Sequence, residues 1–226
     1  MSKKSILRKI LAILARAAVR KYNPIIVGIT GSVGKTSAKE AIFAVLKNKY
    51  RTRTSEKNYN NEIGLPLTIL GIPHCGRNIF AWCFELVRTF FRGVLGQYQY
   101  PEILILEYGV DRPGDMDYLL SIARPNIAIV TAIGEIPAHV EFFKDPEELV
   151  KEKGKLVEAL PSDGTAILNH DDYAVYDMNS VRKKSLQATE VAPIGAAFSS
   201  GMKEKTQAGI MTYGVEERSD FRIVNY

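Results

Sequence analysis

Seven consecutive residues combine small, hydroxyl-bearing and cationic side chains in one short stretch: Gly31, Ser32, Val33, Gly34, Lys35, Thr36 and Ser37. Glycines let backbone N–H groups turn inward, and a helix that follows them directs its positive end to the same point. Lys35 can reach the terminal phosphates of a nucleotide, and the Thr36 hydroxyl can bind Mg²⁺. We therefore predict a phosphate-binding loop; the alternative is a tight strand-to-helix turn that happens to contain a lysine.

The loop departs from the strict phosphate-loop pattern at one position. That pattern has a glycine five places before Gly34, where this chain has Ile29, and the glycine stands one step earlier, at Gly28.

The flanking residues predict the elements that position this loop. "PIIVGIT" (24–30) is typical of a short buried strand, and the spacing of apolar residues in 36–50 predicts a helix. Further strands are expected at 50–55, 101–109, 126–134, 164–169, 209–214 and 221–226, and helices at 78–98, 115–125, 145–160 and 171–181. A polar loop is expected at 56–66, with a short apolar piece at 67–72. Strands that alternate with helices predict an α/β fold with a largely parallel sheet and helices on both faces.

Three candidate segments follow predicted strands directly. They are the phosphate loop, Glu107 at the end of one apolar run, and "TAIGEIPAH" (131–139) after the next. In open parallel sheets, ligands bind beyond the carboxyl ends of the strands. We therefore expect these segments to form one site.

The charge of the chain is unevenly distributed. The chain has 226 residues and a net charge of +5, and residues 1–21 contain seven lysines and arginines and no acidic residue. Subtracting those seven charges leaves about −2 for the remainder, so the main domain is not expected to bind nucleic acid. The two cysteines do not form a disulfide framework, and we expect a reducing, cytoplasmic setting.

Residues 1–23 are expected to form a basic amphipathic helix that precedes the main domain, 24–226. Ile6, Ile10, Ile13 and Ala17 share one helical face, beside Leu7, Leu11 and Leu14. Two interpretations remain open: peripheral contact with an anionic membrane at the inner membrane surface through residues 1–21, or packing against the domain. The helix predicted at 78–98 is expected to cover a sheet face, with membrane contact as the alternative.

Five motifs occur in an order that resembles the central ATP-binding domain of the Mur ligase family. They are "GITGSVGKTS", "NYNNEIGLPLTIL", "LEYGVDRPGDM", "IVTAIGEIPAHVEFF" and "KEKGKLVEALPSDGTAILNHDD". The resemblance covers roughly 24–220, and "NNEIGLPLT" is specific to one branch of the family. It implies a phosphate-loop NTPase-like fold and an ATP-dependent ligase of peptidoglycan precursor synthesis. Such an enzyme activates a carboxylate as an acyl phosphate, which an amino acid or dipeptide amine then attacks.

The resemblance also implies roles for individual residues. Lys35 and the loop amides from Ser32 to Thr36 are expected to bind the β- and γ-phosphates of ATP. Thr36, Glu107, His139 and Lys153 are expected around Mg²⁺, with Lys153 carbamylated; Lys35, Lys153 and His139 form the expected catalytic set. The remaining nucleotide-binding positions are expected to be Gly31, Gly34, Ser37, Asn60, Asn61, Asn169 and Asp172. Asn60 and Asn61 could instead only build a turn, and Asn169 and Asp172 could only cap a helix.

The sequence departs from the family pattern in three ways. The family's usual "TNIG" is "TAIG" here, so Ala132 removes one polar side chain. The family's amino-terminal uridine-nucleotide domain and its carboxyl-terminal domain have no counterpart in these 226 residues. We therefore expect an incomplete central domain that needs a further domain or a partner chain for ligation.

Other functions remain open at this point. The chain could be an amide ligase for another substrate, either folylpolyglutamate-synthase-like or acting on a lipid-linked precursor. It could also be a non-catalytic ATP-binding or scaffold module, although such a module has no need of a metal-ligand set. A generic phosphate-loop ATPase or kinase leaves "NNEIGLPLT" unexplained.

Overall fold

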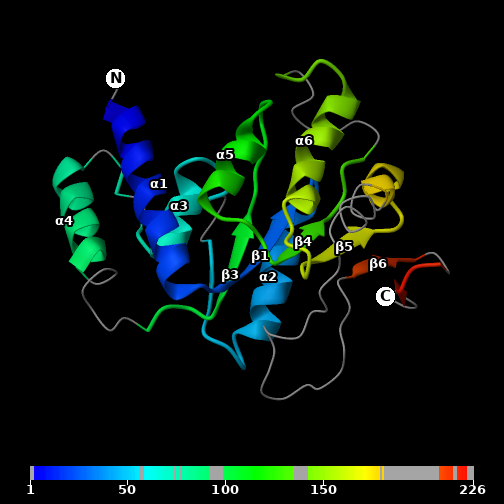
Figure 1. The fold of residues 1–226 in the computed structure, drawn as a ribbon, viewed down its shortest axis with the longest axis horizontal. Helices are drawn as coiled ribbons and strands as arrows, with labels where there is room; N and C mark the ends of the chain where they lie inside the picture. Colours follow the sequence, from blue (N-terminus) through cyan, green and yellow to red (C-terminus); the bar gives the residue numbers. More distant parts are fainter. Residues whose placement is uncertain are drawn as a thin grey trace.

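The computed structural model describes residues 3–55, 59–73, 75–76, 78–91, 99–134, 142–178, 180, 209–215 and 218–222. Within these residues one seven-stranded sheet has the order β2-β3-β1-β4-β5-β6-β7 (Figure 1). Every neighbouring pair of these strands runs parallel. The α/β fold with a largely parallel sheet is therefore confirmed.

Apart from the short β2 and β7, the strands coincide with apolar runs of the sequence. Their bounds are β1 Ile25–Thr30, β2 Thr52–Thr54, β3 Ile103–Glu107, β4 Ile127–Val130, β5 Thr165–Asn169, β6 Ile210–Gly214 and β7 Phe221–Arg222. β3 is buried at every position, because helices cover both faces of the sheet there. β1 lies between β3 and β4, and Ile29 pairs with Glu107 and Ile129. The ends of β3 and β4 therefore flank the loop that follows β1.

The helices that cover the sheet form two layers, one on each face. Their bounds are α1 Lys3–Tyr22, α2 Lys35–Leu46, α3 Gly64–Leu70, α4 Ile79–Phe90, α5 Asp115–Ile122 and α6 Pro146–Glu158. α2 packs on one face of the sheet, in a cluster with Val27, Ile105 and Ile129. α1, α3, α5 and α6 contribute to the larger core on the other face. Residues 173–178 are also helical and place Val175 and Met178 in that core.

α6 begins as its sequence predicts. The Asp145 side chain accepts a hydrogen bond from the Glu148 N–H at 2.7 Å, and Pro146 occupies the first turn. This cap fixes where the helix starts and therefore which of its residues face the sheet.

The expected loop at 56–66 is wrong at its end, because α3 already begins at Gly64. The Asn61 side chain closes the preceding turn by accepting from the N–H groups of Ile63 and Gly64, at 3.1 and 3.0 Å. Gly64 is required because a Cβ there would lie 2.5 Å from the Tyr59 backbone. Pro66 is tolerated in the first turn, where N–H groups have no helical acceptor. The apolar piece at 67–72 is thus mostly helix.

The expectation that the helix at 78–98 covers a sheet face is also wrong. α4 packs outside α1 and α3, farther from the sheet (Figure 1). Its inward side chains, Trp82 and Leu86, join a separate cluster with Leu11 and Leu67. Residues 92–98 lie outside the described part of the chain.

α1 packs into the core through one face only. Leu11, Ala12 and Ala15 are buried, whereas Ile6, Ile10 and Ile13 are exposed. The Arg16 guanidinium also donates to the Ser121 carbonyl at 2.9 Å, which ties α1 to α5. Among the described helices, none combines the length and the hydrophobicity needed to cross a bilayer.

Candidate phosphate and metal site

The loop after β1 adopts a backbone that needs glycine at two positions. Gly31 has φ of 143° and Gly34 has φ of 87°. A Cβ on Gly31 would also collide with the Thr131 hydroxyl. The loop therefore packs closely against the end of β4 and needs glycine at these two positions.

Residues after β4 hold the loop in place. Thr131 Oγ1 donates to the Val33 carbonyl at 2.6 Å or to the Thr30 carbonyl at 3.1 Å. The Ala132 carbonyl accepts from the N–H groups of Ser32 and Val33, at 2.7 and 3.1 Å. Ala132 thus contacts the loop through its backbone, so its lost polar side chain does not affect this contact.

These contacts reduce the number of loop N–H groups that can bind phosphate, because those of Ser32 and Val33 already donate to the Ala132 carbonyl. α2 begins at Lys35 and has no side-chain cap. The first N–H groups of a helix have no acceptor within the helix, so those of Lys35, Thr36 and Ser37 are available to an anion. Thr36 and Ser37 are both exposed in this first turn.

Two lysines converge on the loop from different helices. Lys35 Nζ donates to the Gly31 carbonyl at 2.7 Å, and Lys153 Nζ, from α6, donates to the same carbonyl at 3.1 Å. Burial lowers the pKa of Lys35, while Glu107 and Asp111 oppose that shift. Burial and then the charge of Lys35 lower the pKa of Lys153 to about 8, with Asp111 opposing. The two amines therefore create an electropositive point beside the loop.

Glu107 stands at the end of β3, next to the loop, and is 1% exposed. Its Oε1 is buried and has no hydrogen-bond partner among the described residues. Lys39 Nζ lies 3.3 Å away from this oxygen as an ion pair and also donates to the Ser55 carbonyl at 2.9 Å. A buried carboxylate oxygen with spare acceptor capacity is the kind of ligand that Mg²⁺ takes, so Glu107 fits the expected metal.

Lys39 is the site residue that sequence reasoning missed. It is fully buried and stands one helical turn after Lys35 on α2. That spacing places both lysines on one helical face, which was the available signal. Its buried acidic partner, Glu107, is distant in the sequence and is brought to Lys39 only by the fold.

Asn60 and Asn61 separate into different roles. The Asn60 carbonyl accepts from Gly109 N–H at 2.8 Å, and a Cβ on Gly109 would lie 2.6 Å from Asn60 Cγ. Asn60 therefore lies against the chain directly after Glu107. The Asn61 side chain instead closes the turn before α3, as described above.

Asn169, the last residue of β5, and Asp172 both accept hydrogen bonds from backbone N–H groups. Asn169 Oδ1 accepts from Asp171 N–H at 3.1 Å. Asp172 Oδ2 accepts from the N–H groups of Ile133 and Gly134, at 2.7 and 2.9 Å, and thereby anchors the segment after β4. His139 belongs to 135–141, which lies outside the described residues.

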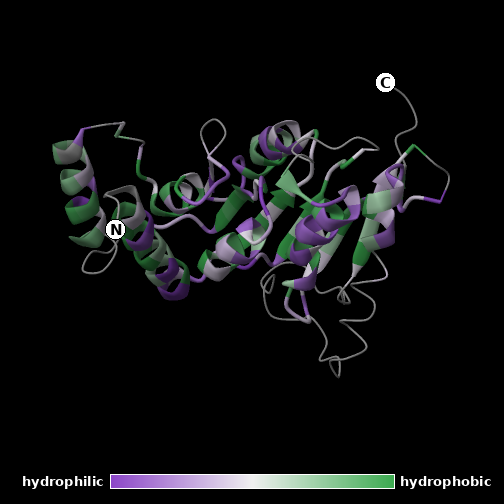
Figure 2. Cartoon of the chain, turned by 90° about the horizontal axis from the view of Figure 1, so that it is seen from above, coloured by the Kyte–Doolittle hydropathy of each residue, from purple (hydrophilic) through white to green (hydrophobic). Residues whose placement is uncertain are grey.

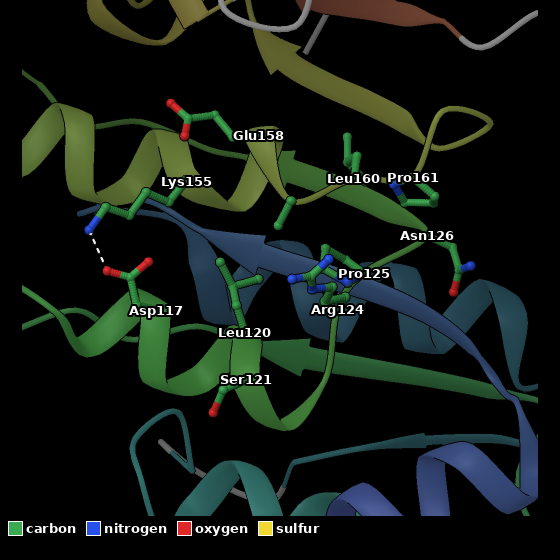
Figure 3. A pocket seen from close by; sticks show the side chains of 11 residues that line it. Asp117, Leu120, Ser121, Arg124, Pro125, Asn126, Lys155, Glu158, Leu160 and Pro161 are labelled. Carbon is green, nitrogen blue, oxygen red and sulfur yellow. Dashed lines mark hydrogen bonds and ion pairs between the residues drawn. The ribbon is translucent and has the colours of Figure 1, made fainter. Parts of the chain in front are cut away.

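A separate cavity of about 610 Å³ opens between α5 and α6 (Figure 3). Pro125 and Asn126, which precede β4, and Pro161, which precedes β5, line it together with the Lys155–Asp117 ion pair at 2.7 Å. Because these residues precede their strands, the cavity lies at the amino-terminal ends of the strands, whereas the phosphate loop lies at the carboxyl-terminal ends.

Comparison with known proteins identifies the family. The sequence model of the Mur ligase middle domain matches residues 29–223, so the chain belongs to the Mur ligase family. The UDP-N-acetylmuramoyl-tripeptide–D-alanyl-D-alanine ligase (MurF) of Bacillus subtilis is 31% identical over 172 residues, 76% of this chain and 32% of that protein. The ligase of the same name from Mycobacterium leprae is 33% identical over 153 residues, 68% of this chain and 24% of that protein.

Solved structures agree with this assignment. MurF from Thermotoga maritima in complex with ADP is 27% identical, with a TM-score of 0.63, and the match covers 92% of this chain and 37% of that one. The fold of FolC from Escherichia coli is also similar, at 16% identity and a TM-score of 0.51. The curated relatives thus place the chain in the MurF branch of the family, which confirms the branch indicated by "NNEIGLPLT". The chain spans about a third or less of the length of the curated relatives cited here.

Proposed function

We propose that this chain binds Mg·ATP and is the ATP-using part of a MurF-like amide ligase. The observation that carries the proposal is the meeting of Lys35 and Lys153 at the Gly31 carbonyl, beside Glu107 at the neighbouring strand end. Two amines suit a polyphosphate, and a buried carboxylate oxygen suits its metal. The ADP complex of the Thermotoga maritima relative supports the nucleotide.

In the proposed reaction a substrate carboxylate oxygen attacks the γ-phosphorus of ATP, and the bond to the β–γ bridging oxygen breaks to release ADP. An amine then attacks the acyl carbon, phosphate leaves, and the amine loses a proton. Lys35 and the first-turn amides of α2 hold the phosphates and offset the charge that spreads over the transferred group. Glu107, Thr36 and His139 would hold Mg²⁺, which neutralises phosphate charge when bound.

Lys153 would serve as a carbamate. A pKa near 8 leaves about a tenth of its amine neutral at pH 7, far more than an ordinary lysine has. A neutral amine adds to CO₂ and releases one proton, which turns a cation into a carboxylate able to face the metal. Asn60 lies at the strand end beside Glu107 and would border the phosphates, whereas Asn169 and Asp172 would border the rest of the nucleotide.

The relatives' name indicates the substrate class. We propose that the carboxylate belongs to a muramoyl-tripeptide precursor and the amine to D-alanyl-D-alanine, in the cytoplasm. A further domain or a partner chain would supply the amine site, because the match covers only about a third of the length of the longer relatives.

Titration of the 226-residue chain with Mg·ATP in a calorimeter tests the nucleotide site. We expect binding heat for the unchanged chain and binding that is weaker by about 10- to 100-fold for Lys35→Ala, since charged hydrogen bonds contribute about 1.5–3 kcal/mol each. Lys47 is an exposed lysine at the other end of α2, so Lys47→Ala should bind Mg·ATP as tightly as the unchanged chain does. No heat from the unchanged chain, or equal binding by Lys35→Ala, would contradict the proposal.

A further inference from the structure

The outward face of α1 is apolar where a solvent-facing helix would be polar. Ile6, Ile10 and Ile13 are 45%, 39% and 60% exposed, and Ala17 is also exposed. Their spacing of four, three and four residues forms one continuous stripe along the helix. The opposite face, with Leu11 and Ala15 at 0% exposure, packs into the core. The stripe is thus not needed to attach α1 to the fold.

α4 repeats this arrangement with larger side chains. Phe80, Phe84, Val87 and Phe91 are 84%, 66%, 55% and 55% exposed, at the same spacing of four, three and four residues. Trp82 and Leu86, on the other side of the helix, already attach it to α1 and α3.

The two helices lie side by side. Leu7 and Leu11 of α1 share one apolar cluster with Trp82 and Leu86 of α4. Figures 1 and 2 both place α4 next to α1, at the end of the molecule away from β6 and β7. Two adjacent helices therefore expose eight apolar side chains at one end of the molecule, more than scattered surface hydrophobics explain.

Basic residues border the stripe on α1. Lys9, Arg20 and Lys21 are exposed, and at 3.6 residues per turn Lys9 and Arg20 fall on one side of the stripe and Lys21 on the other. Seven of the chain's cationic residues lie in 1–21 without one acidic residue, while the remaining residues carry a net −2. The surface that complements this face is therefore both apolar and anionic.

We propose that the outer faces of α1 and α4 form a peripheral binding surface for an anionic lipid bilayer. The isoleucines and phenylalanines enter the boundary between headgroups and acyl chains, and the flanking lysines and arginine contact the lipid phosphates. None of these residues belongs to the phosphate and metal site, so the proposal holds independently of nucleotide binding.

Co-sedimentation of the full chain with lipid vesicles tests this surface. We expect binding to phosphatidylcholine vesicles that contain about 30% phosphatidylglycerol, weak binding to pure phosphatidylcholine, and release at about 0.5 M salt, where surface charges are screened. Ile10→Gln with Ile13→Gln, and separately Phe80→Gln with Phe84→Gln, should each lower the partition coefficient at least tenfold. Lys9→Gln with Arg20→Gln should lower it about fivefold per charge at low salt.

Matched substitutions elsewhere provide the controls. Val45→Gln replaces an apolar residue of α2 that is 71% exposed, and Lys47→Gln with Lys49→Gln removes two exposed charges near that helix. These variants and Lys35→Ala should bind vesicles as the unchanged chain does, and circular dichroism verifies that each variant is folded.

Three results would overturn the proposal. The first is no binding of the unchanged chain to anionic vesicles at low salt. The second is an equal loss of binding in the α2 controls. The third is self-association of the chain in sedimentation velocity that Ile10→Gln with Ile13→Gln abolishes, because the face would then be a protein interface.

Discussion

Lys153 shows how much of a residue's chemistry depends on its surroundings in the fold. In the sequence it stands among Lys151, Glu152 and Lys155, like any member of a charged helix face. In the structure Lys151 is exposed, whereas Lys153 is 3% exposed and points at the loop after β1. The family resemblance predicted a role for this lysine; the residue pattern alone did not, because burial is a property of how α6 packs.

Replacing Lys153 with methionine should stabilise the free protein near neutral pH. The folded-state pKa of about 8 lies below the ordinary value of 10.5, so folding disfavours the charged amine. That cost, about 3 kcal/mol, is fully present below pH 8 and disappears as the pH rises above about 10.5, where the amine is neutral in both states. The Gly31 carbonyl keeps its bond from Lys35, so the substitution leaves no buried acceptor unpaired.

Denaturant unfolding of both chains in CO₂-free, metal-free buffer measures this effect. The advantage of Lys153→Met should be about 1–3 kcal/mol at pH 7 and should fall to about a quarter of that value by pH 10. Lys151→Met, on the exposed side of the same helix, should change stability by less than about 0.5 kcal/mol at either pH. An advantage that does not vary with pH would show that burial of the charge is not its cause.

Replacing Lys39 with methionine should have the opposite effect and destabilise the protein. Its ammonium group is the positive partner, at 3.3 Å, of a Glu107 carboxylate that is almost fully buried. Lys39→Met removes the ion-pair partner of that buried charge and should lower the free energy of unfolding by about 3–5 kcal/mol. Adding Glu107→Gln removes the unpaired charge, so the double variant should recover part of the loss. If Lys39→Met costs under about 1 kcal/mol and the double variant recovers nothing, the pair is not stabilising.

At the level of helices and strands, the sequence was informative wherever one face or both faces are buried. Continuous apolar runs predicted β1, β3 and β4, because these strands of a parallel sheet are covered on both sides, whereas alternate residues of β5 are only partly buried. The order of elements also predicted that Glu107 and the segment after β4 would meet the phosphate loop, and the structure confirms it for Glu107, Thr131 and Ala132.

The errors fall where tertiary contacts decide. Asparagines and a proline in 56–66 are typical of a loop, yet the Asn61 side chain and the close approach of Gly64 to Tyr59 start a helix there. The hydrophobicity of 78–98 suggested a helix over the sheet, but α1 and α3 already cover that region, and α4 packs on them instead. Periodicity identifies an apolar face without showing what covers it.

For the molecule as a whole, α1 is part of the main core and also carries the proposed membrane-facing stripe. Its inner residues Leu11, Ala12 and Ala15 are at most 2% exposed, and they pack against residues of α3 and α5. Burying one such leucine contributes about 1.5–3 kcal/mol, so the whole inner face contributes a large part of a typical stability of about 5–15 kcal/mol. Removing the helix would therefore do more than remove a membrane contact.

Deletion of residues 1–21 should consequently destabilise the entire domain. We expect the melting temperature to fall by more than about 10 °C, or the cooperative transition to disappear, because the deletion exposes Leu67 and Trp82 to water. Ile10→Gln with Ile13→Gln should instead melt within about 3 °C of the unchanged chain, since both side chains already face solvent. Differential scanning calorimetry gives the melting temperatures of the three chains and so distinguishes the contribution of the inner face of α1 to stability from that of its outer face. A truncated chain that melts at the original temperature would mean that the domain folds without this helix, and would refute the structural role argued for its inner face.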